Sequence, residues 1–127
     1  MIERYGTENV LVAVAGEDVV GSLLLGPWTD LESSHHVLEV KGLAVDPARQ
    51  GEGVGAALLD AAIGRARECG ARRLALRVLS GNAVARHLYE SRGFALEGAR
   101  REAFLLEGAY VDDLMMGLDL TAAAGRP

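Results

Sequence analysis

Three glycines at alternate positions, followed at once by an apolar run, place the strongest constraint on how this chain folds. The stretch reads QGEGVGAALLD, with glycines at positions 51, 53 and 55. Glycine allows close backbone approach, and the apolar residues that follow recur at helical spacing. The stretch therefore predicts a loop that leads into a helix over residues 53–70. The backbone N–H groups at such a helix start are suited to binding phosphate.

Apolar runs on both sides of this loop predict a mixed sheet. Strand patterns occur at residues 10–15, 19–25, 37–45, 74–79, 94–106 and 110–120, and a second helix at residues 82–92. Glycine-containing turns at 16–18 and 107–109 join two pairs of these strands as hairpins. The order predicts a central βαβ unit flanked by antiparallel hairpins in a single α/β domain. We expect that domain to cover residues 1–120, followed by a flexible tail over residues 121–127.

Length and composition exclude several classes of function. The chain has 127 residues, half of them hydrophobic, which suffices for one domain with one core. No apolar run approaches the roughly 20 residues of a membrane span, and the N-terminal residues are too polar for a signal peptide. The single cysteine and the net charge of −5 argue against disulfides and against a nucleic-acid partner. We expect a soluble, cytoplasmic protein without a metal, membrane or nucleic-acid partner.

The glycine loop alone leaves its ligand open. A Walker loop needs a lysine and a hydroxyl residue after the last glycine, whereas Ala56 and Ala57 follow Gly55 here. Gly51, Gly53 and Ala56 formally meet the dinucleotide-binding fingerprint. However, the residues DPARQ separate that fingerprint from the preceding strand, and the next strand ends without an acidic residue for a ribose hydroxyl. A P-loop hydrolase is excluded and a dinucleotide-binding fold is disfavoured.

Two motifs together resemble the GNAT superfamily of N-acetyltransferases. NAVARHLYESRGF, residues 82–94, matches the family pattern N-x-x-A-x-x-L-Y-x-x-x-G-F at every fixed position, and QGEGVG matches Q/R-x-x-G-x-G. The resemblance runs from about residue 10 to residue 120. It implies a GNAT-like domain with a mixed, mostly antiparallel sheet flanked by helices. The strand and helices that usually open that fold would be missing or reduced to a stub, because only nine residues precede Val10.

The resemblance implies acetyl-coenzyme A (acetyl-CoA) as the acetyl-donor cosubstrate. Its pyrophosphate would rest on backbone N–H groups of the glycine loop, and its pantetheine arm on the strand at residues 37–45. The residues expected at this site are Leu43, Val45, Gln50, Gly51, Glu52, Gly53, Val54, Gly55, Ala56, Asn82, Arg86 and Tyr89. Helical spacing places Asn82, Arg86 and Tyr89 on one face. Without the glycine loop, Asn82 would be interpreted as a helix cap and Tyr89 as a packed core ring.

Acetyl transfer to an amine needs a base, an oxyanion site and an acid. Tyr89 is the candidate acid for the leaving thiolate, as the matching tyrosine is in the family, and Leu43 and Val45 would offer N–H groups to the oxyanion. Glu39, a charged residue among apolar strand neighbours, is the candidate base. The alternatives are a solvated Glu39 that pairs with Lys41 or an arginine, and deprotonation through water.

The last predicted hairpin resembles bacterial GNAT enzymes that act on free amino acids, phosphinothricin-type compounds or protein N-termini. Its layout is EG…R…EGxYVDxLMM, in which Asp112 and Asp113 alternate, so that one of them could hold the cation of the acceptor. Solvated acids near a turn are the alternative. The leading function is therefore N-acetylation of a small primary amine such as an amino acid. The alternatives are a protein N-terminal acetyltransferase and a non-catalytic coenzyme A-binding module.

We also expect a homodimer. If the usual first helices are missing, the apolar faces of residues 10–15 and 19–25 need a cover other than water, and a second copy is the simplest one. The partner's loop around Trp28 could then complete the acceptor wall. The alternatives are a monomer in which residues 1–9 fold back onto the sheet, and a purely structural role for Trp28.

Overall fold

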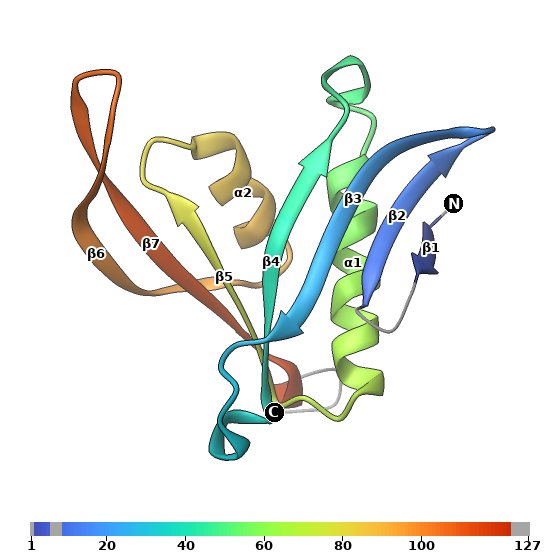
Figure 1. The fold of residues 1–127 in the computed structure, drawn as a ribbon, viewed down its shortest axis with the longest axis horizontal. Helices are drawn as coiled ribbons and strands as arrows, with labels where there is room; N and C mark the ends of the chain where they lie inside the picture. Colours follow the sequence, from blue (N-terminus) through green and yellow to red (C-terminus); the bar gives the residue numbers. More distant parts are fainter. Residues whose placement is uncertain (1, 6–8, 123–127) are drawn as a thin grey trace.

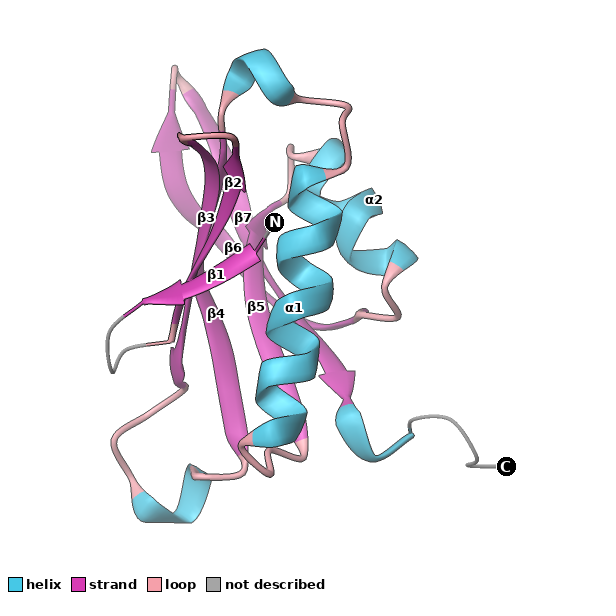
Figure 2. Cartoon of the chain, turned by 90° about the vertical axis from the view of Figure 1, so that its right-hand side faces the viewer, coloured by secondary structure: helices cyan, strands magenta, loops and turns pink. Residues whose placement is uncertain are grey.

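A computed structural model describes residues 2–5 and 9–122, which form one seven-stranded sheet with two helices on one of its faces (Figures 1 and 2). The strands are β1 (Ile2–Tyr5), β2 (Val10–Ala15), β3 (Asp18–Pro27), β4 (Val37–Val45), β5 (Arg73–Leu79), β6 (Ala95–Leu106) and β7 (Ala109–Asp119). The helices are α1 (Val54–Glu68) and α2 (Ala83–Ser91), with short 3-10 turns η1 (Glu32–Ser34), η2 (Pro47–Arg49) and η3 (Leu120–Ala122). The spatial order of the strands is β1-β2-β3-β4-β5-β7-β6.

The predicted topology is confirmed. β4 and β5 run parallel and are joined through α1, whereas the other described pairings in the sheet are antiparallel. Each predicted strand and helix is present, and the bounds differ by at most two residues. β1 is not among the strands that the sequence predicts; its four residues pair with β2 and match the stub expected ahead of the first hairpin.

β4 and β5 separate soon after they begin. Their pairing is limited to residues 37–39 against residues 73–75, after which the strands diverge toward the top of Figure 1, with α2 drawn between them. Lys41 is an extra residue that forms a bulge in the pairing of β4 with β3. Because of this bulge, Val40 before it and Leu43 after it both pack toward the core.

The hydrophobic core lies between the sheet and α1. The buried residues of α1 are Leu58, Leu59, Ala62, Ile63 and Ala66, which recur at helical spacing. They share one core cluster with Leu23 of β3 and with Leu74 and Leu76 of β5. α1 ends before Gly70, whose φ of 80° is the left-handed conformation that terminates many helices.

The argument for a dimer from uncovered strands β2 and β3 is wrong. α1 packs on both strands, and their buried residues in the core cluster are Leu11, Ala13, Val20, Leu23 and Leu25. Exposed large apolar side chains gather instead near the end of the β6–β7 hairpin, at Phe104, Leu105, Leu106 and Tyr110. β5 pairs with β7 only as far as Asp113, so the hairpin extends past the rest of the sheet (Figure 1).

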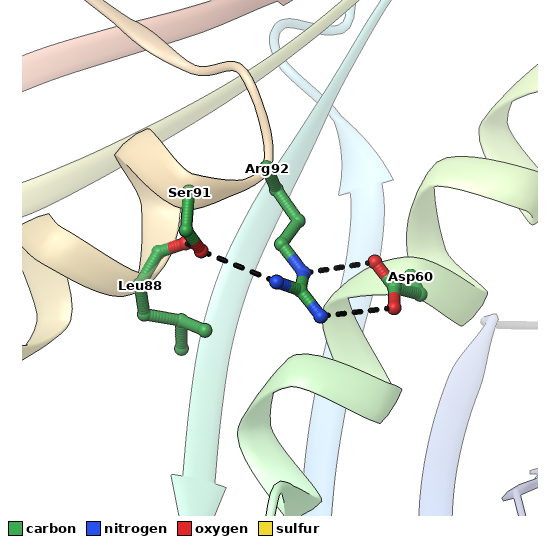
Figure 3. Close-up of polar contacts among 4 residues, drawn as sticks. All are labelled: Asp60, Leu88, Ser91 and Arg92. Atoms are coloured by element: carbon green, nitrogen blue, oxygen red, sulfur yellow. Dashed lines mark hydrogen bonds and ion pairs between the residues drawn. The ribbon is translucent and has the colours of Figure 1, made fainter.

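An ion pair ties the end of α2 to α1. Arg92 places Nε 3.0 Å and Nη2 3.3 Å from the two carboxylate oxygens of Asp60 (Figure 3). Arg92 also donates from Nη1 to Ser91 Oγ, which in turn donates to the carbonyl of Leu88. This two-pronged geometry fixes where α2 ends relative to α1.

The tail predicted at residues 121–127 lies mainly outside the described residues. Its first two residues belong to η3, where Asp119 Oδ1 accepts the N–H of Thr121 at 2.9 Å. Neither α1 nor α2 is long and apolar enough to cross a membrane.

Candidate active site

The glycine loop leads from β4 into α1 with its backbone uncovered. Asp46 accepts the N–H of Ala48 at 2.9 Å and so begins η2. The chain then turns through Gly51 and Gly53, whose φ angles of 86° and 82° favour glycine. A Cβ added to either glycine would meet no atom within 4 Å, and no side chain caps the start of α1. The helix start therefore presents backbone N–H groups to the space outside the loop.

Gly55 has a different role from the other two glycines. A Cβ there would lie 3.3 Å from Leu88 Cδ2 and 3.7 Å from Val45 Cγ2. The absence of a side chain thus lets the first turn of α1 approach both α2 and β4. This contact brings the loop, the strand and the second helix around one space.

That space is a cavity of about 560 Å³, called here the glycine-loop cavity. Its predicted lining residues are Leu43, Val45, Gln50, Gly51, Gly53, Val54, Gly55, Ala56, Asn82 and Tyr89. Sequence reasoning missed Arg49, Val84, Ala85, His87, Leu88 and Ser91, several of which share a face of α2 by helical spacing.

Two residues predicted at this site are not part of the cavity lining. Glu52 forms an ion pair with Arg49 at 3.4 Å, along the loop. Arg86 forms one with Glu90 at 3.3 Å, along α2. In both cases the side chain pairs with a residue of opposite charge three or four positions away. The shared helix face predicted for Arg86 takes no account of such a partner.

Asn82 and Tyr89 anchor the two ends of the α2 wall. Asn82 Oδ1 accepts the N–H of Ala85 at 3.1 Å, so Asn82 is a helix cap as well as a lining residue. Tyr89 is only 8% exposed, and its ring meets Phe94 edge-to-face with 6.2 Å between centroids. Burial raises the pKa of the Tyr89 phenol above its ordinary value. The phenol is therefore protonated at neutral pH, which is the state that a proton donor needs.

The backbone of β4 offers donors in the gap between β4 and β5. The N–H of Asp46 donates to the carbonyl of Val20 on β3 at 2.8 Å. Successive N–H groups of a strand point to opposite edges, so those of Val45 and Leu43 point away from β3. β5 does not pair with β4 at these positions. Two N–H groups thus face the gap on the side of the glycine-loop cavity.

The sheet face opposite the helices carries a second cavity of about 420 Å³, called here the open-face cavity. Its lining residues are Trp28, Val37, Glu39, Arg73, Leu74, Ala75, Leu76, Arg77, Glu97, Arg100, Asp113, Met115, Met116 and Gly117. Four of the charged members form ion pairs across strands, Arg77 with Asp113 and Arg73 with Glu97.

Glu39 lies in the open-face cavity rather than in the glycine-loop cavity. It occupies the last position of β4 that pairs with β5, where these two strands begin to diverge. Its carboxylate lies 3.3 Å from Lys41 Nζ, so the ion pair considered as an alternative is present. β4 therefore contributes to both cavities, with Glu39 on one face and Leu43 and Val45 on the other.

The other acceptor candidates also separate by position. Asp113 is 8% exposed and lines the open-face cavity, whereas Asp112 Oδ1 accepts the N–H of Glu102 at 2.8 Å. Trp28 is 53% exposed and lines the same cavity. Trp28 therefore lies where an acceptor could contact it, and its role stays a prediction.

Known proteins resemble this chain over a segment that includes the glycine loop and α2. The chain matches the model of the Acetyltransferase (GNAT) family over residues 2–94. It is 31% identical over 111 residues to the L-amino acid N-acyltransferase MnaT of Escherichia coli (strain K12), covering 87% of this chain and 64% of that protein. It is 39% identical over 94 residues to a mycothiol acetyltransferase of Propionibacterium freudenreichii, covering 72% and 29%. The chain thus spans less than two thirds of either relative.

Solved structures share the fold along nearly the whole chain. The yncA protein of Salmonella typhimurium, solved with its cofactor acetyl-CoA, has a TM-score of 0.84 and 29% identity over 95% of this chain and 69% of that one. A ribosomal-protein-alanine N-acetyltransferase from Brucella melitensis has a TM-score of 0.81 and 31% identity, covering 88% and 68%. Since the family match also includes the glycine loop and α2, this chain belongs to the GNAT family of acetyltransferases.

Proposed function

We propose that this protein transfers the acetyl group of acetyl-CoA to a primary amine. One observation carries the proposal: the glycine-loop cavity brings together the uncovered start of α1, the free N–H edge of β4 and a buried, neutral phenol. These groups correspond to a phosphate site, an oxyanion site and a proton donor. Acetyl-CoA would supply the pyrophosphate and the activated thioester.

The glycine loop fits the pyrophosphate. The N–H groups of Gln50 and Glu52 donate to the carbonyls of Pro47 and Arg49 within the loop. Those of Gly51, Gly53 and the first turn of α1 lie at the positive end of the helix dipole, and a Cβ at Gly51 or Gly53 would meet no atom within 4 Å. Arg49 lines the same cavity and adds a cation beside the loop. Its ion pair with Glu52 is exposed, so it is weak enough to exchange for a phosphate.

Tyr89 would protonate the departing thiolate, and Leu43 and Val45 would stabilise the oxyanion through their N–H groups. The phenol lines the cavity in its protonated form, so it can give its proton directly to the thiolate. The oxyanion donors are backbone groups of a paired strand, so they need little reorganisation.

Glu39 would take the proton from the incoming ammonium, whose pKa of about 10 keeps it charged near neutral pH. The amine would then approach from the open-face cavity, on the other side of the gap between β4 and β5. A water molecule between Glu39 and the amine remains compatible with the same arrangement.

The acceptor that we propose is a small amine such as an amino acid. The E. coli relative is named as an L-amino acid N-acyltransferase, and the open-face cavity is of small-molecule size. The Brucella structure is named as a ribosomal-protein-alanine N-acetyltransferase, so a protein N-terminus is the second candidate. A non-catalytic coenzyme A-binding module would not need Tyr89 as a proton donor.

The test is a panel of amines, amino acids and peptides, followed by release of free coenzyme A thiol. Turnover that depends on both acetyl-CoA and an amine supports the proposal. Tight binding of acetyl-CoA without turnover of any amine would support the binding module instead.

We also propose that two copies associate through the end of the β6–β7 hairpin. Phe104, Leu105, Leu106 and Tyr110 are exposed there, on an edge that the described part of the sheet leaves unpaired. Light scattering at micromolar concentration should give about twice the 13.4 kDa of one chain, and Phe104→Ser should lower it. Val19→Ser, at an even more exposed apolar residue on β3, is the control. A mass of one chain with full activity would contradict the dimer.

A further inference from the structure

Arg77 has an arrangement that the steps above do not use. It lies on β5, two residues beyond Ala75, which pairs with Glu39 on β4. Its Nε lies 3.3 Å from Asp113 Oδ2 on β7. No other ion pair or hydrogen bond holds the guanidinium among the described residues, and 59% of the side chain is exposed. Nη1 and Nη2 are therefore open to the cavity.

Asp113 gives this guanidinium a fixed orientation. The Asp113 side chain is only 12% exposed, so its carboxylate has little freedom to move. A guanidinium held through Nε presents its two terminal nitrogens as a planar fork, which matches the two oxygens of a carboxylate. Arg73, four residues earlier on the same face, differs because Glu97 already occupies it.

The fork stands next to the proposed base. Arg77 and Glu39 line the open-face cavity together, and they also line a smaller adjoining hollow with Val40 and Lys41. Because β4 and β5 diverge beyond Glu39 and Ala75, the two side chains meet through the hollows that they both line rather than through a regular ladder. A carboxylate on Arg77 and an amine beside Glu39 would thus be near neighbours. Trp28 and Met115, both exposed, offer an apolar wall for a side chain.

We infer that Arg77, positioned by Asp113, binds the carboxylate of the acceptor, and that the acceptors are free α-amino acids. These molecules carry an ammonium and a carboxylate on the same carbon, and Glu39 and Arg77 line one cavity with the two complementary charges. The inference rests on the proposed acetyl transfer and names the class of amine that the open-face cavity selects.

The experiment compares free L-amino acids with their carboxamides, which keep the amine and lose the negative charge. Wild-type protein should favour the acids at least tenfold in kcat/KM. Arg77→Gln should raise KM for the acids by about ten- to a hundredfold, with KM for the amides and for acetyl-CoA unchanged. Arg77→Lys should recover part of the loss, because it restores the charge without the fork. Arg101→Gln, at an exposed arginine of β6 that lines neither cavity, is the matched control and should leave the preference intact.

Asp113→Asn tests the positioning role. It should raise KM for the acids, and it should add little when combined with Arg77→Gln, because both changes disrupt one unit. Equal use of acids and amides by wild type, or equal losses on both in Arg77→Gln, would overturn the inference while acetyl transfer stands. Absence of turnover with every amine would instead overturn the proposed function. Thermal unfolding of each variant, with Arg77→Lys as the milder change, separates loss of folding from loss of binding.

Discussion

The two cavities lie on either side of the same gap in the sheet, and they are built in different ways. The glycine-loop cavity is framed largely by one loop, the start of α1 and one face of α2. Apart from Trp28, the open-face cavity is lined by residues of β4, β5, β6 and β7, which meet through strand pairing. The glycine-loop cavity therefore offers backbone groups, which suit a cosubstrate that many related proteins could share. The open-face cavity offers side chains, which suit an acceptor that differs from one protein to the next.

The two faces of the sheet also differ in charge. The face under α1 buries Leu74, Leu76 and their neighbours, whereas the alternate residues of β5, Arg73 and Arg77, lie on the open face and pair with acids. A face covered with ion pairs does not need a second apolar layer. This difference explains why the open face tolerates solvent without a helix over it.

The largest effect that we expect separates the chemistry of the two cavities. Tyr89→Phe removes the proposed proton donor and should lower kcat about a hundredfold, with the affinity for acetyl-CoA nearly unchanged. The ring would keep its contact with Phe94, so the fold should persist. Steady-state kinetics and calorimetry measure the two quantities. Tyr110→Phe, at an exposed tyrosine, is the control, and an unchanged kcat in Tyr89→Phe would reduce Tyr89 to a packing role.

Glu39→Gln tests the open-face side of the same reaction. We expect kcat/KM to fall by a few tens-fold and the acid limb of the pH–rate profile to flatten, because the proposed base is gone. Lys41→Met removes the ion-pair partner of Glu39 and leaves the carboxylate in place. That control should keep the limb. Persistence of the limb in Glu39→Gln would assign the proton transfer to water or to another group.

Gly53→Val tests whether the backbone of the glycine loop binds the pyrophosphate of acetyl-CoA. A side chain would intrude where the pyrophosphate is proposed to bind, and the dissociation constant of acetyl-CoA should rise tenfold or more, about 1.4 kcal/mol. Valine at positive φ also costs folding stability. Gly16→Val, at a φ of 64° in the β2–β3 turn, carries the same strain at a residue that does not line the cavity. Equal affinity in Gly53→Val and wild type would place the phosphate elsewhere.

Alkaline pH should sharpen the contrast between the buried and exposed tyrosines. Burial raises the pKa of Tyr89 in the folded state, so the folded protein holds that proton more tightly than the unfolded chain. This contribution to stability is complete below the ordinary tyrosine pKa of about 10 and is lost as the pH rises through the raised value. Denaturant unfolding between pH 8 and 11 should show a steeper loss in wild type than in Tyr89→Phe. Parallel curves for the two proteins would contradict the raised pKa.

The smallest effect concerns the link between the helices. Asp60→Asn weakens the exposed pair with Arg92 and should lower the free energy of unfolding by no more than about 1 kcal/mol. A double-mutant cycle with Arg92→Gln measures the coupling. Because the pair sets where α2 ends, a slight loss of acetyl-CoA affinity should accompany it. A much larger destabilisation would show that α2 depends on this ion pair for its position against α1.

The sequence made the glycine-loop cavity predictable because its parts are local. Gly51 and Gly53 share one loop, and Asn82 and Tyr89 share one short helix, so spacing alone brings them together. The pairing of Arg86 with Glu90 was missed because a helix also offers charged residues a partner one turn away.

The open-face cavity was not predictable in the same way. Arg77 and Asp113 come from strands far apart in the chain and meet only through the register of β5 with β7. That register, set by buried Leu76 and Met116 on the other face, is a property of the folded sheet. Glu39 stands out in the sequence as a charged residue among apolar strand neighbours, but the cavity that it lines depends on the divergence of β4 and β5 in the folded sheet.

The bulge at Lys41 means that the layout of β4 depends on a count of residues as much as on their identity. Glu39, Leu43 and Val45 are all odd positions, and an unbroken strand would point all three to the same side. The extra residue resets the alternation, so the acid faces one cavity and the two aliphatic residues face the other. A one-residue deletion between 40 and 43 would therefore move the acid or the aliphatic pair through the sheet. Insertions and deletions in this part of β4, more than substitutions, would change which of the two cavities each of these residues lines.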